Sequence, residues 1–141
     1  MKLIYLAQPY TSPDHDVQEA RFEEAKIATA KLVDRGSVYS PIVHGHVMVL
    51  PLAREGRDTT SHNFWMRQCI PILRKSDEMI VLPLLGWRHS RGLREELNLC
   101  KMLHIPVRFL TPKTITADHY SRFDFPEVAE AESHSWEFLY V

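Results

Sequence analysis

The sequence of 141 residues lacks several features that mark specialised classes of protein. Its two cysteines, Cys69 and Cys100, lie on separate segments without a CxxC spacing, which argues against a disulfide framework. The net charge is only −1, so no electrostatic footprint for nucleic acid or an anionic membrane is visible. The longest apolar runs are far short of a bilayer span, and the start, MKLIYLAQPY, has no signal-peptide pattern. We therefore expect a cytoplasmic protein with free thiols and neither a nucleic acid nor a membrane as partner.

What the sequence does contain is the composition of an ordinary globular domain, 45% hydrophobic and 25% charged. We expect a single domain over residues 1–141, with a core in 1–110 and a C-terminal extension in 111–141. Residues 41–60 mix apolar residues with prolines and glycines, which predicts an irregular loop and a short helix. The other expected elements are strands at 2–7, 37–40, 78–85 and 105–110, and helices at 14–35, at 61–75 and from the GWRHSRG turn to about 104.

This alternation of strands and helices predicts an α/β fold. We expect a flavodoxin- or Rossmann-like parallel sheet of four to five strands with helices on both faces. Right-handed crossovers then place the loops after Ala7, Ser40 and Leu85 at the carboxyl edge of the sheet. Ligands bind at that edge in open α/β folds, so we look for the functional site there.

Two adjacent glutamates, Glu95 and Glu96, stand in the stretch GWRHSRGLREEL that leads into the last helix. On a helical wheel Glu96 falls between Leu93 and Cys100 on the apolar stripe, whereas Glu95 projects about 100° away. A carboxylate on an apolar face costs several kcal/mol unless partners stabilise it. Glu96 is therefore either solvated at the exposed end of the stripe or a working carboxylate at the ligand edge. Glu95 is expected to be solvated or ion-paired.

The turn before these glutamates has the makings of an anion site. Ser90, Arg91 and Gly92 offer a hydroxyl, a cation and a glycine at a helix N-terminus, which suits an anion such as phosphate. One carboxylate beside such a site favours a phosphorylated substrate, with nucleophilic or general-base chemistry at Glu96.

The histidine pair in HGH raises the question of a metal, because alternate residues on an extended chain point the same way. Zinc needs at least three protein ligands, and no third residue has convincing spacing beside His44 and His46. We therefore predict no metal and interpret both histidines as polar pocket residues, either of which is a candidate to protonate a leaving group.

Several other side chains have two interpretations. Trp87, directly after the buried strand, is as compatible with stacking on a flat ligand as with packing at the core edge. Phe64 and Trp65 fit core packing better than the wall of a pocket. Arg21 fits a solvated helix position better than a phosphate ligand.

Three motifs in series resemble the nucleoside 2-deoxyribosyltransferase superfamily. They are YLAQPY, GSVYSPIVHGH, and SDEMIVLPLLGWRHSRGLREE followed by PVRF. The resemblance covers roughly residues 1–110 and is strongest to the phage and bacterial domains of unknown function in that superfamily. It implies cleavage or transfer at the N-glycosidic bond of a 2′-deoxynucleoside or its 5′-monophosphate, without a metal or organic cofactor. It also implies a homodimer or a higher homo-oligomer.

The resemblance assigns roles to individual residues. In the superfamily a glutamate six residues after a serine attacks C1′ of the sugar, and counting from Ser90 this is Glu96. Tyr5 corresponds to a tyrosine close to the nucleophile. Ser90 and the amides around Gly92 correspond to phosphate contacts. The other substrate-binding residues expected are Gln8, Pro9, Tyr10, His44, His46 and Trp87.

One position departs from the superfamily pattern. Relatives carry an aspartate that helps to protonate the leaving base, and Cys69 stands at this possible acid position. A neutral thiol is a poor proton donor. Three alternatives remain: His44 or His46 supplies the proton, the base leaves easily, or activity is reduced or lost. The competing interpretation is therefore a non-catalytic nucleotide-binding or sensing domain.

Overall fold

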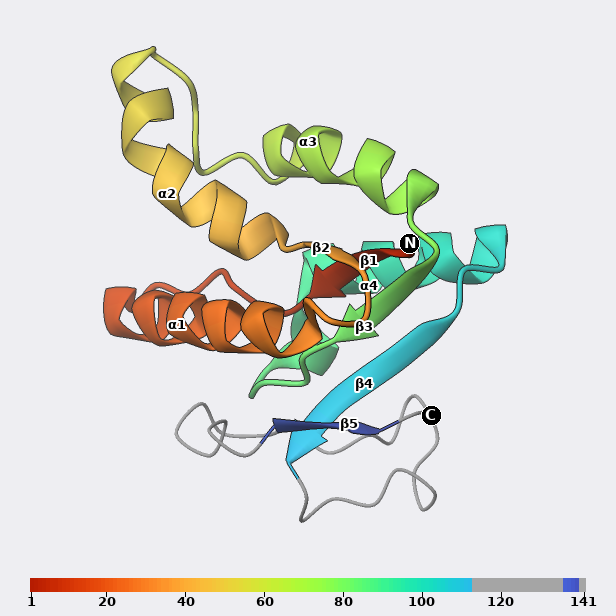
Figure 1. The fold of residues 1–141 in the computed structure, drawn as a ribbon. Helices are drawn as coiled ribbons and strands as arrows, with labels where there is room; N and C mark the ends of the chain where they lie inside the picture. Colours follow the sequence, from red (N-terminus) through yellow and green to blue (C-terminus); the bar gives the residue numbers. More distant parts are fainter. Residues whose placement is uncertain (113–135, 140–141) are drawn as a thin grey trace.

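The structure, a computed structural model, describes residues 1–112 and 136–139. Its five-stranded sheet has the order β2-β1-β3-β4-β5 (Figure 1). The first four strands run parallel, and β5 pairs antiparallel with β4. The strands are β1 (Leu3–Ala7), β2 (Ser37–Tyr39), β3 (Glu78–Val81), β4 (Val107–Pro112) and β5 (Trp136–Leu139). The helices are α1 (His15–Leu32), α2 (Pro41–Arg54), α3 (His62–Lys75) and α4 (Arg91–Leu103), with a short 3₁₀ helix η1 (Trp87–His89). The predicted α/β class and parallel sheet are confirmed.

Helices cover both faces of the sheet, and residue alternation along β1 sorts the core into two parts. Tyr5 and Ala7 point to the face covered by α3 and α4, where they pack in one buried cluster with residues of both helices. Ile4 and Leu6 point to the other face and pack with Ala28 and Leu32 of α1. The strand order turns back between β1 and β3, so the crevice at the carboxyl ends of these two strands is the expected ligand position.

Each helix begins at a polar side chain that caps its first turn, which fixes where the helix starts after its strand or loop. The capping residues are Asp14, Ser40, Ser61 and Ser90, whose side chains accept from the backbone N–H of Asp16, Val43, Phe64 and Leu93 respectively. Since Ser40 and Ser90 follow the ends of β2 and β3 in the chain, α2 and α4 both start near the carboxyl edge.

At the amino ends of the strands, hydrogen bonds and a close backbone contact stabilise the start of β1. Asp77 accepts a hydrogen bond from the Leu3 N–H at 2.7 Å, which gives it a structural role. Ser37 N donates to the Lys2 carbonyl at 2.8 Å. A side chain at Gly36 would place its Cβ 2.4 Å from the same carbonyl oxygen, so only glycine fits there without a backbone shift.

The prediction of an irregular loop and a short helix over 41–60 was wrong. Residues Pro41–Arg54 form one helix of 14 residues. Proline at the first helical position lacks only an N–H that would be unsatisfied anyway, and Ser40 caps the start, so Pro41 begins the helix instead of preventing it. Pro51 is accommodated in the last turn. Most of the predicted extension 111–141 lies outside the described residues, apart from the end of β4 and β5.

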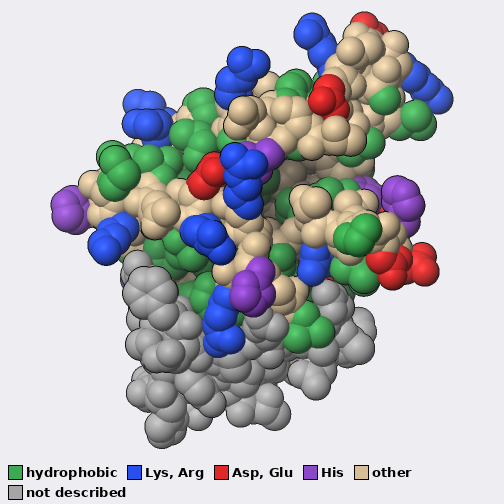
Figure 2. Space-filling view, turned by 180° about the vertical axis from the view of Figure 1, so that it is seen from behind, with side chains coloured by type: hydrophobic (Ala, Val, Ile, Leu, Met, Phe, Trp, Pro, Cys, Tyr) green, Lys and Arg blue, Asp and Glu red, His purple; other side chains and the backbone are tan. Residues whose placement is uncertain are grey.

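The distribution of charged side chains on the described surface agrees with the net charge near zero. On the face shown in Figure 2, Lys and Arg side chains are interspersed with hydrophobic, acidic and histidine side chains and do not gather into one continuous patch. Within the described ranges no helix combines the length and the apolar character needed to span a bilayer.

Candidate active site

Four ionisable side chains meet where β1, β2, α3 and α4 come together: Tyr5, Tyr39, Cys69 and Glu96. We call them the tyrosine–glutamate cluster. The rings of Tyr5 and Tyr39 lie 5.8 Å apart between centroids. The Tyr5 hydroxyl lies close enough to Glu96 and Cys69 for both groups to influence its pKa. Tyr5 is fully buried, and Glu96 and Cys69 are each 7% exposed.

Glu96 is the most perturbed carboxyl of the described residues. Burial disfavours its charged form and raises its pKa from 4.5 to about 7, and the neighbouring charge of Glu95 adds to this rise. The nearby Tyr5 hydroxyl acts in the opposite direction. A carboxyl with a pKa of about 7 exchanges its proton near neutral pH, which suits nucleophilic or acid–base chemistry. The prediction that Glu96 lies inside the buried stripe of α4 is confirmed, since Leu93, Glu96 and Cys100 are all buried.

Tyr5 is held as a neutral phenol. Burial, followed by the charge of Glu96 and then Cys69, raises its pKa well above the ordinary value. Its hydroxyl lies near both groups yet makes no hydrogen bond of complete geometry with any described residue. Buried hydroxyls are nearly always satisfied. The Tyr5 O–H is therefore a protonated donor that lies beside the Glu96 carboxyl.

The other two members of the cluster are also neutral near pH 7. Burial, with the charge of Glu96 next, raises the pKa of the Cys69 thiol to about 11. Burial raises the pKa of Tyr39 to about 12. Both cysteines of the chain are free and buried. A thiol with this pKa is a poor proton donor at neutral pH, so Cys69 does not replace an aspartic acid in that role.

A cavity of about 420 Å³ opens between α2 and α3 and reaches the cluster at Tyr39 and Cys69. Phe64 and Trp65 line it, so the expectation that they belong to the core was wrong. Trp65 is fixed by a hydrogen bond from its indole N–H to the Thr59 carbonyl, at 2.8 Å. The remaining lining residues are His44, Met48, Leu52, Arg57, Arg67 and Gln68.

Gly45 sets the spacing between the two helices that wall this cavity. It is the buried residue of α2, and it faces the ring of Trp65 on α3. A Cβ at this position would lie 3.2 Å from the Trp65 ring, tighter than ordinary van der Waals contact. The ring can sit close to α2 because position 45 has no side chain.

The two histidines of the HGH motif point in different directions, because residues two apart on a helix lie about 200° apart. The extended-chain geometry assumed for them was wrong. His44 lines the cavity and lies near Tyr39. His46 instead accepts a hydrogen bond from the Tyr10 hydroxyl at Nδ1 and pairs through Nε2 with Glu19 at 2.9 Å. Among the described residues no group of three side chains is placed to bind a metal.

His46 therefore joins the β1–α1 loop and α1 to α2. Its ring stacks on Phe22 at 4.1 Å, and its two nitrogens bond to Tyr10 and Glu19. Neither Tyr10 nor His46 lines the cavity. In this structure both residues hold the β1–α1 loop and α1 against α2. The substrate contacts expected of them stay predictions.

The predicted loop residues Gln8 and Pro9 are buried beside α1. The Gln8 side-chain amide donates to the Arg21 carbonyl at 2.9 Å, while its Oε1 has no hydrogen-bond partner among the described residues. Arg21 is buried, and its guanidinium donates to the carbonyls of Thr11 and Leu85, at 3.1 and 3.0 Å. The expectation of a solvated Arg21 was wrong, because two loop carbonyls at the carboxyl edge need a donor.

Trp87 is a core residue in this structure. It is 4% exposed and packs edge-on against Phe109, with ring centroids 5.4 Å apart. This burial favours the core-packing alternative, whereas a role of Trp87 in substrate binding stays a prediction.

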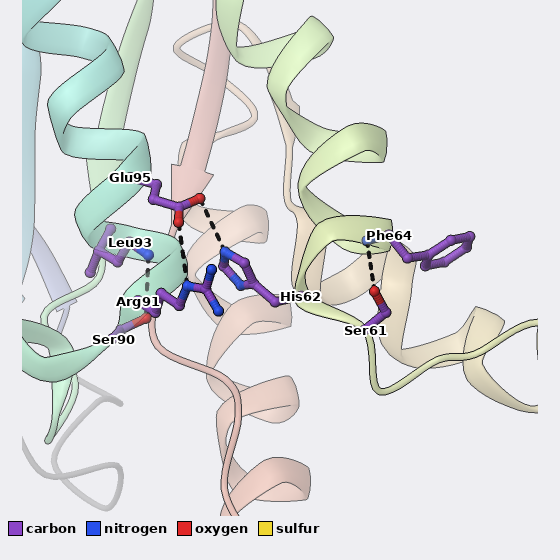
Figure 3. A network of polar contacts seen from close by, with 7 residues as sticks. All are labelled: Ser61, His62, Phe64, Ser90, Arg91, Leu93 and Glu95. Carbon is purple, nitrogen blue, oxygen red and sulfur yellow. Dashed lines mark hydrogen bonds and ion pairs between the residues drawn. The ribbon is translucent and has the colours of Figure 1, made fainter.

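The start of α4 faces the start of α3 across a polar contact (Figure 3). Glu95 pairs with His62 of α3 at 3.0 Å and with Arg91 at 3.4 Å, which confirms that it is an exposed, ion-paired residue. The Ser90 hydroxyl oxygen accepts from Leu93 N at 3.3 Å and so caps the helix. Phosphate binding by this turn stays a prediction.

Gly92 lies beside the same contact without a close approach. A Cβ there would meet only Met66 and His62, at 3.8 and 3.9 Å, which is ordinary contact. The structure thus brings together Tyr5, His44, Cys69 and Glu96 of the predicted residues and sets the others apart. Sequence reasoning missed Tyr39, Arg57 and Arg67. Only Tyr39 carried a signal, its position at the end of a strand within GSVYSP.

Three comparisons place the chain among known proteins. No curated protein matches it. A solved structure of a 2-deoxyribosyltransferase from the psychrotolerant bacterium Bacillus psychrosaccharolyticus is similar over 76% of this chain and 70% of that chain, with 19% identity and a TM-score of 0.49. This likeness carries no conclusion about substrate or reaction. A family model described as a domain of unknown function, DUF1937, matches residues 2–111. Because that match spans well over half of the sequence, the chain belongs to the DUF1937 family.

Proposed function

We propose that this protein cleaves or transfers at the N-glycosidic bond of a 2′-deoxynucleoside or a deoxynucleoside 5′-monophosphate, with Glu96 as the nucleophile. The observation that carries the proposal is the buried Glu96 carboxyl, whose pKa is raised to about 7 beside the protonated Tyr5. The sequence resemblance assigns the same two residues to the reacting centre. The cluster also adjoins an aromatic-lined cavity suited to a flat ring.

The chemistry follows the two-step logic of retaining glycosidic cleavage. The ionised Glu96 carboxylate attacks C1′, the bond from C1′ to the base nitrogen breaks, and a covalent deoxyribosyl-enzyme forms. Water or a second base then resolves the intermediate. The Tyr5 hydroxyl donates to the carboxylate oxygen that does not attack, which orients the nucleophile. Because the pKa of Glu96 is about 7, a large fraction of the enzyme is ionised at neutral pH.

The substrate orientation follows from the position of the cavity. With the sugar against Glu96, the cavity beside Cys69 takes the base, and the 5′ end is directed to the start of α4. Backbone N–H groups at a helix N-terminus favour a phosphate. We therefore favour a 5′-monophosphate as substrate and water as acceptor.

The test is the release of free base from a panel of deoxynucleosides and their monophosphates, separated by chromatography. We expect base release by the wild-type protein and by Glu95→Gln, and none by Glu96→Gln. The matched pair isolates position 96, because Glu95 is its exposed neighbour on the same helix. Activity should also rise with pH through about 7, since only the ionised Glu96 attacks. Full activity of Glu96→Gln would refute the assignment.

The second candidate is a non-catalytic nucleotide-binding domain. The neutral Cys69 thiol, with a pKa of about 11, favours it, because a catalytic acid is expected at this position. Stabilisation of the protein against heat by deoxynucleotides, together with no base release from any of them, would support this candidate. Turnover of any substrate would exclude it.

A further inference from the structure

We propose that Arg57 and Arg67 bind the leaving base and stabilise it as an anion, so that the preferred substrates carry oxo-substituted bases such as 6-oxopurines, uracil or thymine. The inference rests on the proposed function. It identifies what acts on the leaving group in a site whose acid position is held by a cysteine.

The first observation is that the cavity is lined by uncompensated positive charge. Arg57 and Arg67 both line it, and neither guanidinium has a hydrogen bond or an ion pair with any described residue. Asp58, next to Arg57, is turned away, since its carboxylate accepts from the Thr60 amide and hydroxyl at 2.9 and 2.6 Å. Among the described residues that line the cavity there is no carboxylate.

Three other cations of the described residues have a carboxylate partner, which Arg57 and Arg67 lack. Lys26 pairs with Glu23, Arg91 with Glu95 and Arg108 with Glu78, at 2.8, 3.4 and 3.0 Å. The whole chain carries a net charge of −1. The positive charge at the cavity is therefore local, and it attracts a ligand with negative charge or hydrogen-bond acceptors at that place.

The second observation is that this cavity adjoins the tyrosine–glutamate cluster, so it is placed to receive the base in the proposed reaction. It reaches the cluster through Cys69, whose thiol is influenced by the charge of Glu96. Its wall includes the aromatic rings of Tyr39 and Trp65, on which a planar base can stack. The same wall carries the arginines, so the base meets guanidinium groups at its edge.

The third observation concerns the proton that a leaving base ordinarily needs. The cluster offers three neutral groups with raised pKa values, Tyr5, Tyr39 and Cys69, and none of them is an effective acid near pH 7. His44 lines the cavity but is an exposed side chain on its outer wall. A base that departs without a proton must leave as an anion.

The step balances without an acid. The Glu96 oxygen forms a bond to C1′, the bond from C1′ to the base nitrogen breaks, and its electron pair stays on the base. In an oxo-substituted base this charge spreads onto ring carbonyl oxygens, which are acceptors for the planar guanidinium fork. The base anion takes its proton from water after departure. Adenine has no ring carbonyl to take this charge and depends more on prior protonation, while cytosine keeps only its C2 carbonyl and should be intermediate.

The test compares kcat/KM for deoxynucleotides of oxo-bases and of adenine in the wild type, Arg57→Gln, Arg67→Gln and the double variant. Because both side chains are solvent-accessible, we expect about a tenfold loss for each single change on oxo-bases, below the 10²–10³ typical of enclosed donors. Adenine substrates should lose much less. Lys26→Gln is the matched control, since it removes one exposed cation on α1 away from the cavity and should change neither rate.

A readout of the leaving-group charge separates this role from a structural one. Across substrates whose bases differ in N–H acidity, the rate of the double variant should fall more steeply with rising pKa of the base than the wild-type rate. An equal loss for all bases, or no loss, would overturn the proposal.

Binding of free bases keeps the arginine assignment testable if no substrate turns over. Xanthine at mildly alkaline pH is an anion, while adenine stays neutral. We expect calorimetry to show tighter binding of xanthine by the wild type and loss of that preference in the double variant. Absence of base release would refute the proposed function, whereas equal binding of the two bases by wild type and variant would refute the arginine site.

Discussion

Replacing Glu96 by glutamine removes a carboxyl that the fold buries almost completely, and it should change how stability depends on pH. The folded-state pKa of about 7 lies above the ordinary value of 4.5, because burial disfavours the charged form. The folded chain therefore holds this proton more tightly than the unfolded chain. The resulting stabilisation is complete below about pH 4.5 and is lost as the pH rises through about 7.

The size of this effect follows from the two pKa values. At 1.36 kcal/mol per pH unit, the gap between 4.5 and about 7 amounts to about 3 kcal/mol of stability. Such a change is a large part of the total stability of a domain, which is typically about 5–15 kcal/mol. Glutamine cannot ionise, so this pH dependence should be absent from Glu96→Gln.

Urea unfolding at about pH 4 and about pH 8 measures the difference. Relative to the wild type, Glu96→Gln should be about 3 kcal/mol more favourable at the higher pH than at the lower one. Any constant cost of placing an amide in this site cancels in the comparison. Glu95→Gln is the control. It removes only exposed ion pairs, so the free energy of unfolding should change by less than about 1 kcal/mol at either pH. A difference between Glu96→Gln and wild type that is identical at both pH values would refute the burial of this carboxyl.

Two further substitutions test how the fold positions the site. Gly36→Ala places a Cβ against the Lys2 carbonyl oxygen, where only 2.4 Å is available, so chemical denaturation should show a loss of about 1–3 kcal/mol; an unchanged midpoint would contradict the close approach. Tyr10→Phe removes the hydroxyl that donates to His46 and should cost about 1 kcal/mol; in a double-mutant cycle with His46→Ala the two losses should be less than additive, whereas full additivity would mean that the two side chains do not interact.

The sequence correctly predicted those features of the fold that depend on a single local pattern of residues. The continuous apolar runs at β1 and β3 are buried along nearly their whole length, as such runs are in a parallel sheet. The helical period alone separated Glu96 from Glu95, because residues 100° apart on α4 have different surroundings. Which of the two glutamates is buried could therefore be predicted without tertiary information.

The remaining features depend on how separate elements are placed. The course of α2 was hidden by its prolines and glycine, so the sequence could not show that His44 and His46 lie on different sides of a helix. Trp65 reads as a core residue in isolation and lines a cavity only because α2 lies opposite it. Arg57 lies outside the helices, so no periodic pattern marks it as a pocket residue. Only the structure shows that it lines the cavity.

The contact between Gly45 and Trp65 links the stability of α2 to the width of the cavity. A glycine inside a helix lowers helix stability by about 1 kcal/mol relative to alanine, so α2 would be more stable with a methyl group at this position. That methyl would lie only 3.2 Å from the indole ring, so Trp65 or α2 would have to shift. A series of larger apolar residues at position 45 should therefore change the width of the cavity between α2 and α3 without altering its charge.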